Sequence, residues 1–201
     1  MSPRGKALNE EMRAKALKKI TNAALKVFAD YGYNGATMKE IAQVAGLSYG
    51  LVYHYFPSKE NIFRHLVDIA LKKSIETIKD GLAVNGTAWE KLKNLSTYLV
   101  QQVLLHESSQ YFLIMVQALT QGKKIAGLME HIGDYSQLHY NTLIPVIIQA
   151  QESGDVITGD PVALTATYLS FVQGLSFLVF GESGMEEKIT PEILINALRN
   201  K

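Results

Sequence analysis

Cysteine is absent from the 201-residue sequence, which excludes disulfides, thiolate zinc sites and cysteine nucleophiles. Proline is scarce, and most of the five prolines stand where helices are expected to begin. The first twenty residues are charged throughout and lack the apolar stretch of a secretory signal peptide. The most apolar stretch, residues 164–180, is interrupted by Thr, Ser, Gln and Gly, so we expect a buried helix rather than a membrane span. These absences favour a cytoplasmic protein that does not bind a membrane.

Charge is unevenly distributed, although the formal net charge is only +1. Residues 1–60 hold nine Lys or Arg against five Asp or Glu, whereas residues 61–201 hold eleven against fourteen. Hydrophobic residues make up 47% of the chain, which suits a folded protein with a sizeable core. A basic amino-terminal part joined to a mildly acidic remainder indicates that the amino-terminal part alone meets a polyanion.

Apolar residues recur at intervals of three and four almost everywhere, and no convincing two-residue alternation is present. The sequence therefore predicts an all-α protein of about nine helices. We expect an amino-terminal domain of three helices over residues 1–57 and a larger helical domain over 58–201 for ligand binding and dimerisation. The expected helices are 10–31, 37–45, 48–56, 58–82, 87–106, 109–121, 124–152 (with a possible break near Gly133), 160–181 and 190–199, after a mobile basic tail of about ten residues.

The second and third helices are short and are joined by Ala45-Gly46-Leu47, where glycine permits a tight reversal of the chain. This is the pattern of a helix-turn-helix, whose second helix enters the DNA major groove with its amino-terminal end. Small or polar residues at that end would approach base edges, and later hydroxyl, imidazole and ammonium groups suit phosphates. The alternative is an ordinary helical hairpin within a core. The DNA-contact candidates are Thr37, Ser48, Tyr49, Gly50, Tyr53, His54, Tyr55 and Lys59.

Four runs, at residues 23–33, 37–42, 45–48 and 51–60, together resemble the signature of the TetR family, with the ending Tyr-x-Tyr-Phe-x-Ser-Lys. The resemblance covers about residues 10–66. It implies an all-helical homodimer in which the first three helices bind DNA, the fourth links them to a regulatory domain and the last two pair with the partner. Tyr49 stands where many relatives have a basic residue, so we expect a base-stacking or thymine-methyl contact there rather than a phosphate contact.

The resemblance also implies an effector pocket among the fourth to eighth helices. Aromatic and apolar residues interleaved with polar groups would suit a small apolar or amphipathic effector, although a plain helical core is the better explanation for any one of them taken alone. The candidate pocket residues are Trp89, His106, Tyr111, Met115, Gln117, Tyr135, His139 and Phe171. An apolar face on the last two helices predicts the dimer interface, unless it is buried within one subunit. Its candidates are Tyr168, Val172, Leu175, Val179, Ile193 and Leu194.

The histidines lack close metal-ligand spacing, and the sequence has no Gly-rich phosphate loop, no Gly-x-Ser-x-Gly motif and no compelling acid pair. We therefore expect no metal, no cofactor and no enzymatic activity. The prediction is a transcriptional regulator, and by default a repressor, that an effector releases from a pseudo-palindromic DNA operator. Two rivals stay open: a helical enzyme or ligand carrier, and a regulator controlled by a protein partner.

Overall fold

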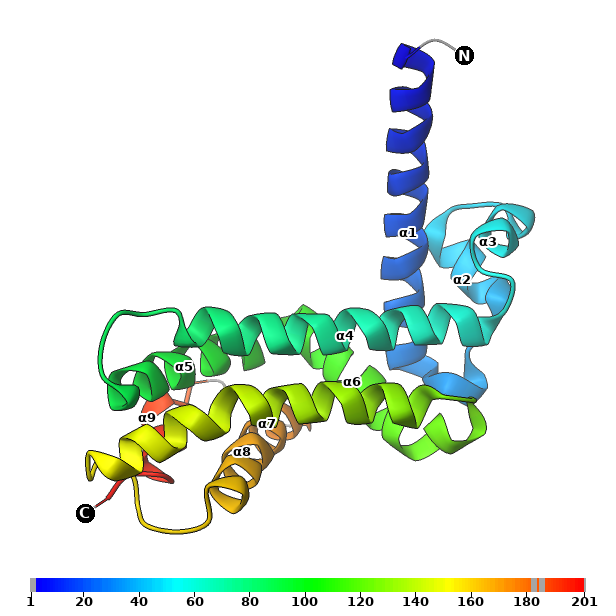
Figure 1. Cartoon of the computed structure of the whole chain (residues 1–201). Helices are drawn as coiled ribbons and strands as arrows, with labels where there is room; N and C mark the ends of the chain where they lie inside the picture. Colours follow the sequence, from blue (N-terminus) through cyan, green and yellow to red (C-terminus); the bar gives the residue numbers. More distant parts are fainter. Residues whose placement is uncertain (1–2, 182–183, 185–186, 201) are drawn as a thin grey trace. The chain divides into compact units, whose positions relative to one another are not determined.

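The computed structural model describes residues 3–181, 184 and 187–200. Within these ranges the chain is all-α, as predicted, with one isolated β-bridge between Val156 and Arg199. The elements are α1 (Pro3–Gly35), α2 (Met38–Ala45), α3 (Tyr49–Tyr55), α4 (Lys59–Leu82), α5 (Ala88–Val103), α6 (His106–Gln121), the 3₁₀ turn η1 (Gly122–Lys124), α7 (Leu128–Glu152), α8 (Pro161–Gly181) and α9 (Pro191–Asn196) (Figure 1).

The contacts divide the chain into two compact units. The first comprises the chain up to Ile69 together with Leu113–Leu128, and the second comprises Ala70–Phe112 together with the chain from Met129. The second half of α6 therefore packs with the amino-terminal helices. In that unit the Gln117 side chain donates a 2.9 Å hydrogen bond to the carbonyl oxygen of Phe28 on α1. The sequence pattern did not predict this attachment, because helical periodicity does not say which helix lies beside which.

Local sequence signals set the ends of the short helices. The Thr37 hydroxyl accepts a hydrogen bond from the Glu40 amide, and the Glu40 carboxylate accepts one from the Thr37 amide, which is the predicted capping box. Gly46 ends α2 in the left-handed conformation, with φ 64° and ψ 34°. Ser48 caps α3 by accepting from the Leu51 amide. The helix-turn-helix boundaries therefore follow directly from the sequence.

The structure corrects several predicted helix ends. Helix α1 begins at Pro3 instead of following a ten-residue tail, and it continues past a kink at Gly32 to Gly35. Helix α7 begins at Leu128 and runs through Gly133 without a break, with Pro145 inside it. Helix α9 ends at Asn196, because the chain turns there so that the Ile157 amide donates to the Leu198 carbonyl at 2.9 Å.

The first unit has an apolar core made by one face of α1 against α2, α3 and the start of α4. Phe63 of α4 packs edge-on against both Phe28 and Tyr33 of α1, with ring centroids 5.3 and 4.7 Å apart. This core fixes how α3 is presented, because the one fully buried side chain of α3, Val52, anchors it. The other core residues include Ile20, Ala24, Val27, Ile41, Ile62 and Leu66.

The second unit has a core formed by α5, α7, α8 and α9. Tyr168 of α8 is fully buried there, and its hydroxyl lies 2.8 Å from the Ser96 hydroxyl of α5, which satisfies two polar groups inside an apolar cluster. The surrounding residues include Leu92, Leu95, Leu99, Leu143, Ile147, Leu194 and Leu198.

Helix α8 does not match the expectation of a buried helix. One helix among the described residues, α8 over Pro161–Val179, is long and apolar enough to cross a membrane by length and composition, and only 17% of that stretch is buried. A helix that is apolar on all sides is normally covered on all sides. The described residues therefore leave the outer face of α8 exposed.

Candidate nucleic-acid interface

The amino-terminal end of α3 is exposed in the first unit. Ser48, Tyr49 and Gly50 are all exposed, whereas Val52 faces the core. A Cβ built on Gly50 would meet open space, so no described residue covers the helix at that position. Among the residues that the structure describes, α3 thus presents the surface that a recognition helix needs, with its polar end outward.

Two tyrosines form the most prominent feature of this end. The Tyr49 and Tyr53 rings are 51% and 38% exposed, and their centroids lie 4.6 Å apart at an interplanar angle of 50°. The hydrogen bond between the two side chains raises the pKa of Tyr49 above its ordinary value. The two rings offer a flat, amphipathic contact at the exposed end of α3. This geometry is consistent with a base or thymine-methyl contact by Tyr49.

Lys59 does not lie as expected for a phosphate contact. Its ammonium donates to the carbonyl oxygens of Tyr33 at 2.7 Å, Ala36 at 3.0 Å and Asn34 at 3.4 Å, and it lies 4.9 Å from the centroid of the Tyr33 ring. An ammonium group has three donors, so these carbonyls at the end of α1 use all of them. In the structure Lys59 therefore closes the end of α1, and its predicted phosphate contact stays a prediction.

The remaining DNA-contact candidates differ in the contacts that they already make within the chain. Thr37 is exposed, but its hydroxyl is engaged with the Glu40 carboxylate at 2.7 Å in the capping box. His54 is exposed and packs edge-on against half-buried Tyr55, with centroids 5.7 Å apart. None of these side chains carries a fixed positive charge, so they suit hydrogen bonds to DNA better than neutralisation of its phosphates.

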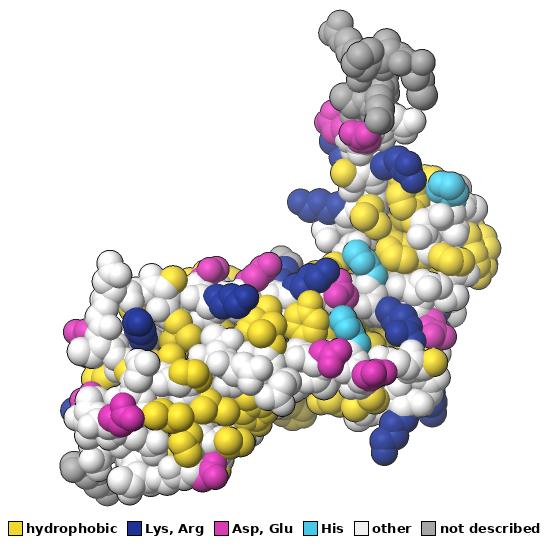
Figure 2. Space-filling model, in the orientation of Figure 1, with side chains coloured by type: hydrophobic (Ala, Val, Ile, Leu, Met, Phe, Trp, Pro, Cys, Tyr) yellow, Lys and Arg dark blue, Asp and Glu magenta, His cyan; other side chains and the backbone are white. Residues whose placement is uncertain are grey.

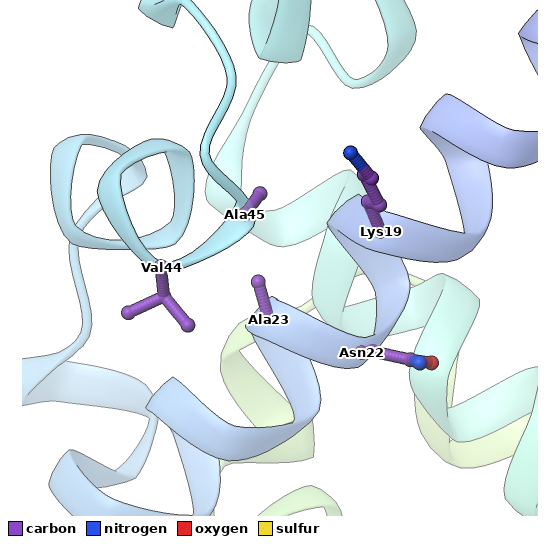
Figure 3. A pocket seen from close by; sticks show the side chains of 5 residues that line it. All are labelled: Lys19, Asn22, Ala23, Val44 and Ala45. Atoms are coloured by element: carbon purple, nitrogen blue, oxygen red, sulfur yellow. The ribbon is translucent and has the colours of Figure 1, made fainter.

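A shallow hollow of about 290 Å³ lies between α1 and the end of α2, directly before the helix-turn-helix reversal. Figure 3 shows Lys19 and Ala23 pointing upward from α1, with Val44 and Ala45 of α2 opposite, whereas the Asn22 side chain points away from α2. This places a basic side chain of α1 beside the turn that leads into α3. The sequence analysis had not connected these two segments.

Comparison with known proteins shows which regulators the chain resembles. Residues 20–66 match the family model described as bacterial regulatory proteins, tetR family. The fatty acid metabolism regulator protein of Bacillus subtilis (strain 168) is 26% identical over 145 residues, which are 72% of this chain and 73% of that protein. Two further Bacillus subtilis regulators match over 45% and 31% of their own length. Residues 20–66 therefore carry the amino-terminal domain of the TetR family of bacterial regulatory proteins.

Solved structures support the same fold. The TetR family regulator PfmR from Thermus thermophilus aligns with a TM-score of 0.74 at 22% identity, over 90% of this chain and 97% of that one. AibR in complex with isovaleryl coenzyme A and operator DNA aligns with a TM-score of 0.71 at 18% identity, over 90% and 94% of the two chains. These proteins are named as regulators, not as enzymes. At such identities the likeness shows the TetR fold alone.

The predicted effector residues lie in different surroundings. Tyr111 is buried beneath the Lys73 ammonium, 4.4 Å from its ring centroid, and His139 Nε2 lies 2.9 Å from the Ser74 hydroxyl. Burial lowers the pKa of His139, which keeps the imidazole neutral near pH 7. These two residues line the same stretch of α4, which makes them the better-supported part of the predicted set.

The other predicted effector residues are more scattered. Trp89 lines a hollow of about 350 Å³ with residues of α9, and half-buried Tyr135 packs edge-on against His131. Half-buried Met115 and Gln117 belong to the first unit. Phe171 is 45% exposed on the outer face of α8. The side chain of His106 lies outside the described residues. No group of three or more potential metal ligands occurs in the part of the chain that the structure describes.

The predicted dimer residues are partly corrected by their burial. Tyr168, Leu175 and Leu194 are buried in the core of their own chain, so they are not available to a partner, and half-buried Val172 and Val179 pack against the same core. Ile193 is exposed. The other five residues fit the alternative that the predicted stripe packs within its own subunit, although α8 as a whole leaves most of its apolar surface exposed.

The exposed side of α8 carries further apolar and small residues beside the six dimer candidates. Small residues recur along it at steps of three and four, flanked by large apolar side chains. That spacing was the signal in the sequence that pointed to this face. The small residues are Ala163, Thr167, Ser170 and Gly174, and the large ones are Phe171, Phe177 and Leu178.

Proposed function

We propose that this chain is a cytoplasmic repressor that binds a pseudo-palindromic operator as a homodimer. The exposed amino-terminal end of α3 carries the proposal, because it offers polar and aromatic groups to base edges while Val52 holds the helix on its core. In the dimer the two α3 ends would lie about 34–36 Å apart and enter successive major grooves on one side of the duplex. Repression would follow from blocking polymerase.

Fluorescence anisotropy with the DNA upstream of the chain's own gene tests this reading. Wild-type protein should bind that DNA more tightly than an unrelated sequence, with an affinity that falls steeply as salt rises. Tyr49→Ala should change the preferred base at one position, whereas Tyr49→Phe should retain the preference if the ring is what reads the DNA. Equal weakening on every sequence would show that Tyr49 reads no base. Binding to no upstream fragment at low salt would reject the regulator.

For dimerisation, the exposed face of α8 supports pairing with the same face of a second copy. Phe177 and Phe171 are 59% and 45% exposed, and fully burying a phenylalanine contributes about 1.5–3 kcal/mol. Covering the two rings on each subunit would therefore contribute about 4 kcal/mol in total. The open space at Gly174 permits close approach of two helices.

The dimer is tested by sedimentation of charged variants at micromolar concentration. Phe177→Asp places a carboxylate in the proposed interface and should shift the protein towards monomer. Leu119→Asp is the matched control, because Leu119 is a similarly exposed apolar residue on α6 and its replacement should leave the dimer intact. A wild-type monomer, or equal effects of the two variants, would reject this interface.

The effector we propose is a molecule with an acyl chain, such as a fatty acid or its coenzyme A thioester. The support comes from two relatives, one named as a regulator of fatty acid metabolism and one solved with isovaleryl coenzyme A. Apolar and aromatic groups beside the neutral His139 suit the apolar part of such a ligand. The effector releases DNA only if it binds the non-DNA state more tightly.

A panel of fatty acids and acyl-coenzyme A thioesters of increasing chain length tests the effector. We expect a rise in the thermal midpoint and release of DNA for one range of chain lengths, and neither for free coenzyme A. If no compound releases DNA from protein that binds it, control by a protein partner becomes the better reading.

A further inference from the structure

The first half of α1 extends beyond the domain that it belongs to. In Figure 1 the dark blue end of α1 continues past α2 and α3. Side chains from Asn9 to Lys15 are exposed, Ala16 and Leu17 are half-buried, and the first buried side chain is that of Ile20. A helix of about three turns without tertiary packing is marginal in water. Most of residues 9–19, which we call the amino-terminal arm, therefore lack tertiary packing among the described residues.

The amino-terminal arm is basic. It carries Arg13, Lys15, Lys18 and Lys19 against two glutamates, and Lys15 is paired with Glu11 at 2.6 Å. Among the described residues, no carboxylate lies within ion-pair distance of Arg13, Lys18 or Lys19. Figure 2 shows basic side chains (dark blue) along this part of α1. Three cations are therefore available to an anionic partner.

The carboxy-terminal end of the arm lies beside the segment that leads into the proposed DNA-reading surface. Lys19 shares the hollow of Figure 3 with Ala45, and α3 starts only a few residues further along the chain, at Tyr49. The eleven residues of the arm span about 16 Å of helix, at about 1.5 Å per residue. Each strand of a duplex presents a phosphate every 3.4 Å or so along its axis. The arm is thus long enough to meet several phosphates.

We propose that the amino-terminal arm is a second DNA contact, which binds the phosphates flanking the half-site read by α3. The inference rests on the proposed function and deepens it. The arm supplies affinity that is independent of sequence, because lysine and arginine on phosphates carry no base information. The tyrosines of α3 supply the discrimination. DNA binding in turn stabilises the helix of the arm.

The test compares two triple variants on the operator and on an unrelated duplex over a range of salt concentrations. One carries Arg13→Gln, Lys18→Gln and Lys19→Gln. The matched control carries Lys79→Gln, Lys93→Gln and Lys123→Gln, which remove the same charge from exposed positions on other helices and η1. The replaced side chains of the arm are exposed, so both proteins should melt at the wild-type temperature.

The arm variant should bind both duplexes on the order of 10- to 100-fold more weakly at about 0.15 M salt, with an unchanged ratio between operator and unrelated DNA. Its plot of log K against log salt should be shallower by about 2.7 per protomer, from about 0.9 per phosphate contact. The control should keep the wild-type slope. The proposed DNA contact of the arm would be rejected if the arm variant kept the wild-type affinity and slope, or if the control lost as much DNA affinity as the arm variant. The proposed function would be unaffected by either result.

Hydrogen exchange of the wild-type protein provides a second measurement. Amides of residues 9–19 should exchange rapidly in the free protein and at least ten-fold more slowly with operator bound. If the amides of residues 9–19 exchanged equally fast in the free protein and in the DNA complex, the proposed DNA contact of the arm would be rejected. A wild-type protein that binds no DNA would overturn the proposed function itself.

Discussion

Replacing Lys59 separates a structural role from a DNA-binding role. Lys59→Met keeps the length of the side chain and removes the ammonium that bonds the carbonyls of Tyr33 and Ala36 at 2.7 and 3.0 Å. A hydrogen bond to a charged group contributes about 1.5–3 kcal/mol. Because Lys59 is half-buried and water can replace part of the loss, we expect a total cost of about 2 kcal/mol rather than the sum.

For a protein of this length, a loss of about 2 kcal/mol lowers the thermal midpoint by roughly 4–8 °C. Thermal melts followed by circular dichroism measure this directly. Lys39→Met is the matched control, because Lys39 is an exposed lysine on the neighbouring helix α2, and such surface changes usually cost less than about 0.5 kcal/mol.

The salt dependence of DNA binding decides between the two roles. If the carbonyls hold the ammonium, Lys59→Met retains the wild-type slope of log K against log salt. An unchanged thermal midpoint, combined with a slope reduced by about 0.9 per protomer, would refute the assignment and restore Lys59 as a phosphate contact.

Three further predictions follow from single contacts. Tyr168→Phe removes the 2.8 Å hydrogen bond to Ser96 and should cost about 1 kcal/mol in urea unfolding; no change would mean that the hydroxyl is solvated. Gly46→Ala should lower the free energy of unfolding by about 1 kcal/mol, because Gly46 has φ 64°. Gly50 lies in a helix with open space around it, so Gly50→Ala should raise that free energy by about 0.5–1 kcal/mol. Burial lowers the pKa of His139 below its ordinary 6.5, so the unfolded chain binds that proton first as the pH falls below 6.5. The fold is therefore destabilised there, and His139→Gln should lose less stability between about pH 7 and pH 5 in thermal melts.

Helix boundaries in the helix-turn-helix were predictable because their signals are local. The capping box at Thr37 and the cap at Ser48 act within three residues, and Gly46 ends α2 through its own backbone conformation. The same reasoning placed Tyr49 at an exposed helix end. Where each constraint lies within one turn of helix, the sequence is sufficient to locate the element.

The sequence was insufficient where a residue's role depends on a distant partner. Lys59 follows a helix start, and nothing within its neighbourhood indicates that carbonyls 23–26 residues earlier would bind it. Tyr168 has the apolar spacing of an interface residue. In the structure it is buried, and its hydroxyl is hydrogen-bonded to Ser96, 72 residues away in the sequence. An apolar stripe predicts burial without indicating whether the same chain or a second copy provides the cover.

The position of Lys59 also bears on how the chain holds DNA. That ammonium is occupied, and the exposed end of α3 carries only Ser48, Tyr49 and Gly50. The reading surface therefore has little charge to offer the phosphates, although counterion release supplies much of the affinity of most DNA-binding proteins. Seven of the nine basic residues between positions 1 and 60 lie on α1. The charge excess of the amino-terminal part therefore belongs to α1, next to α3 rather than on it. In a regulator built this way, changes to α1 alter the affinity for all DNA together, and changes to the tip of α3 alter which sequence is preferred.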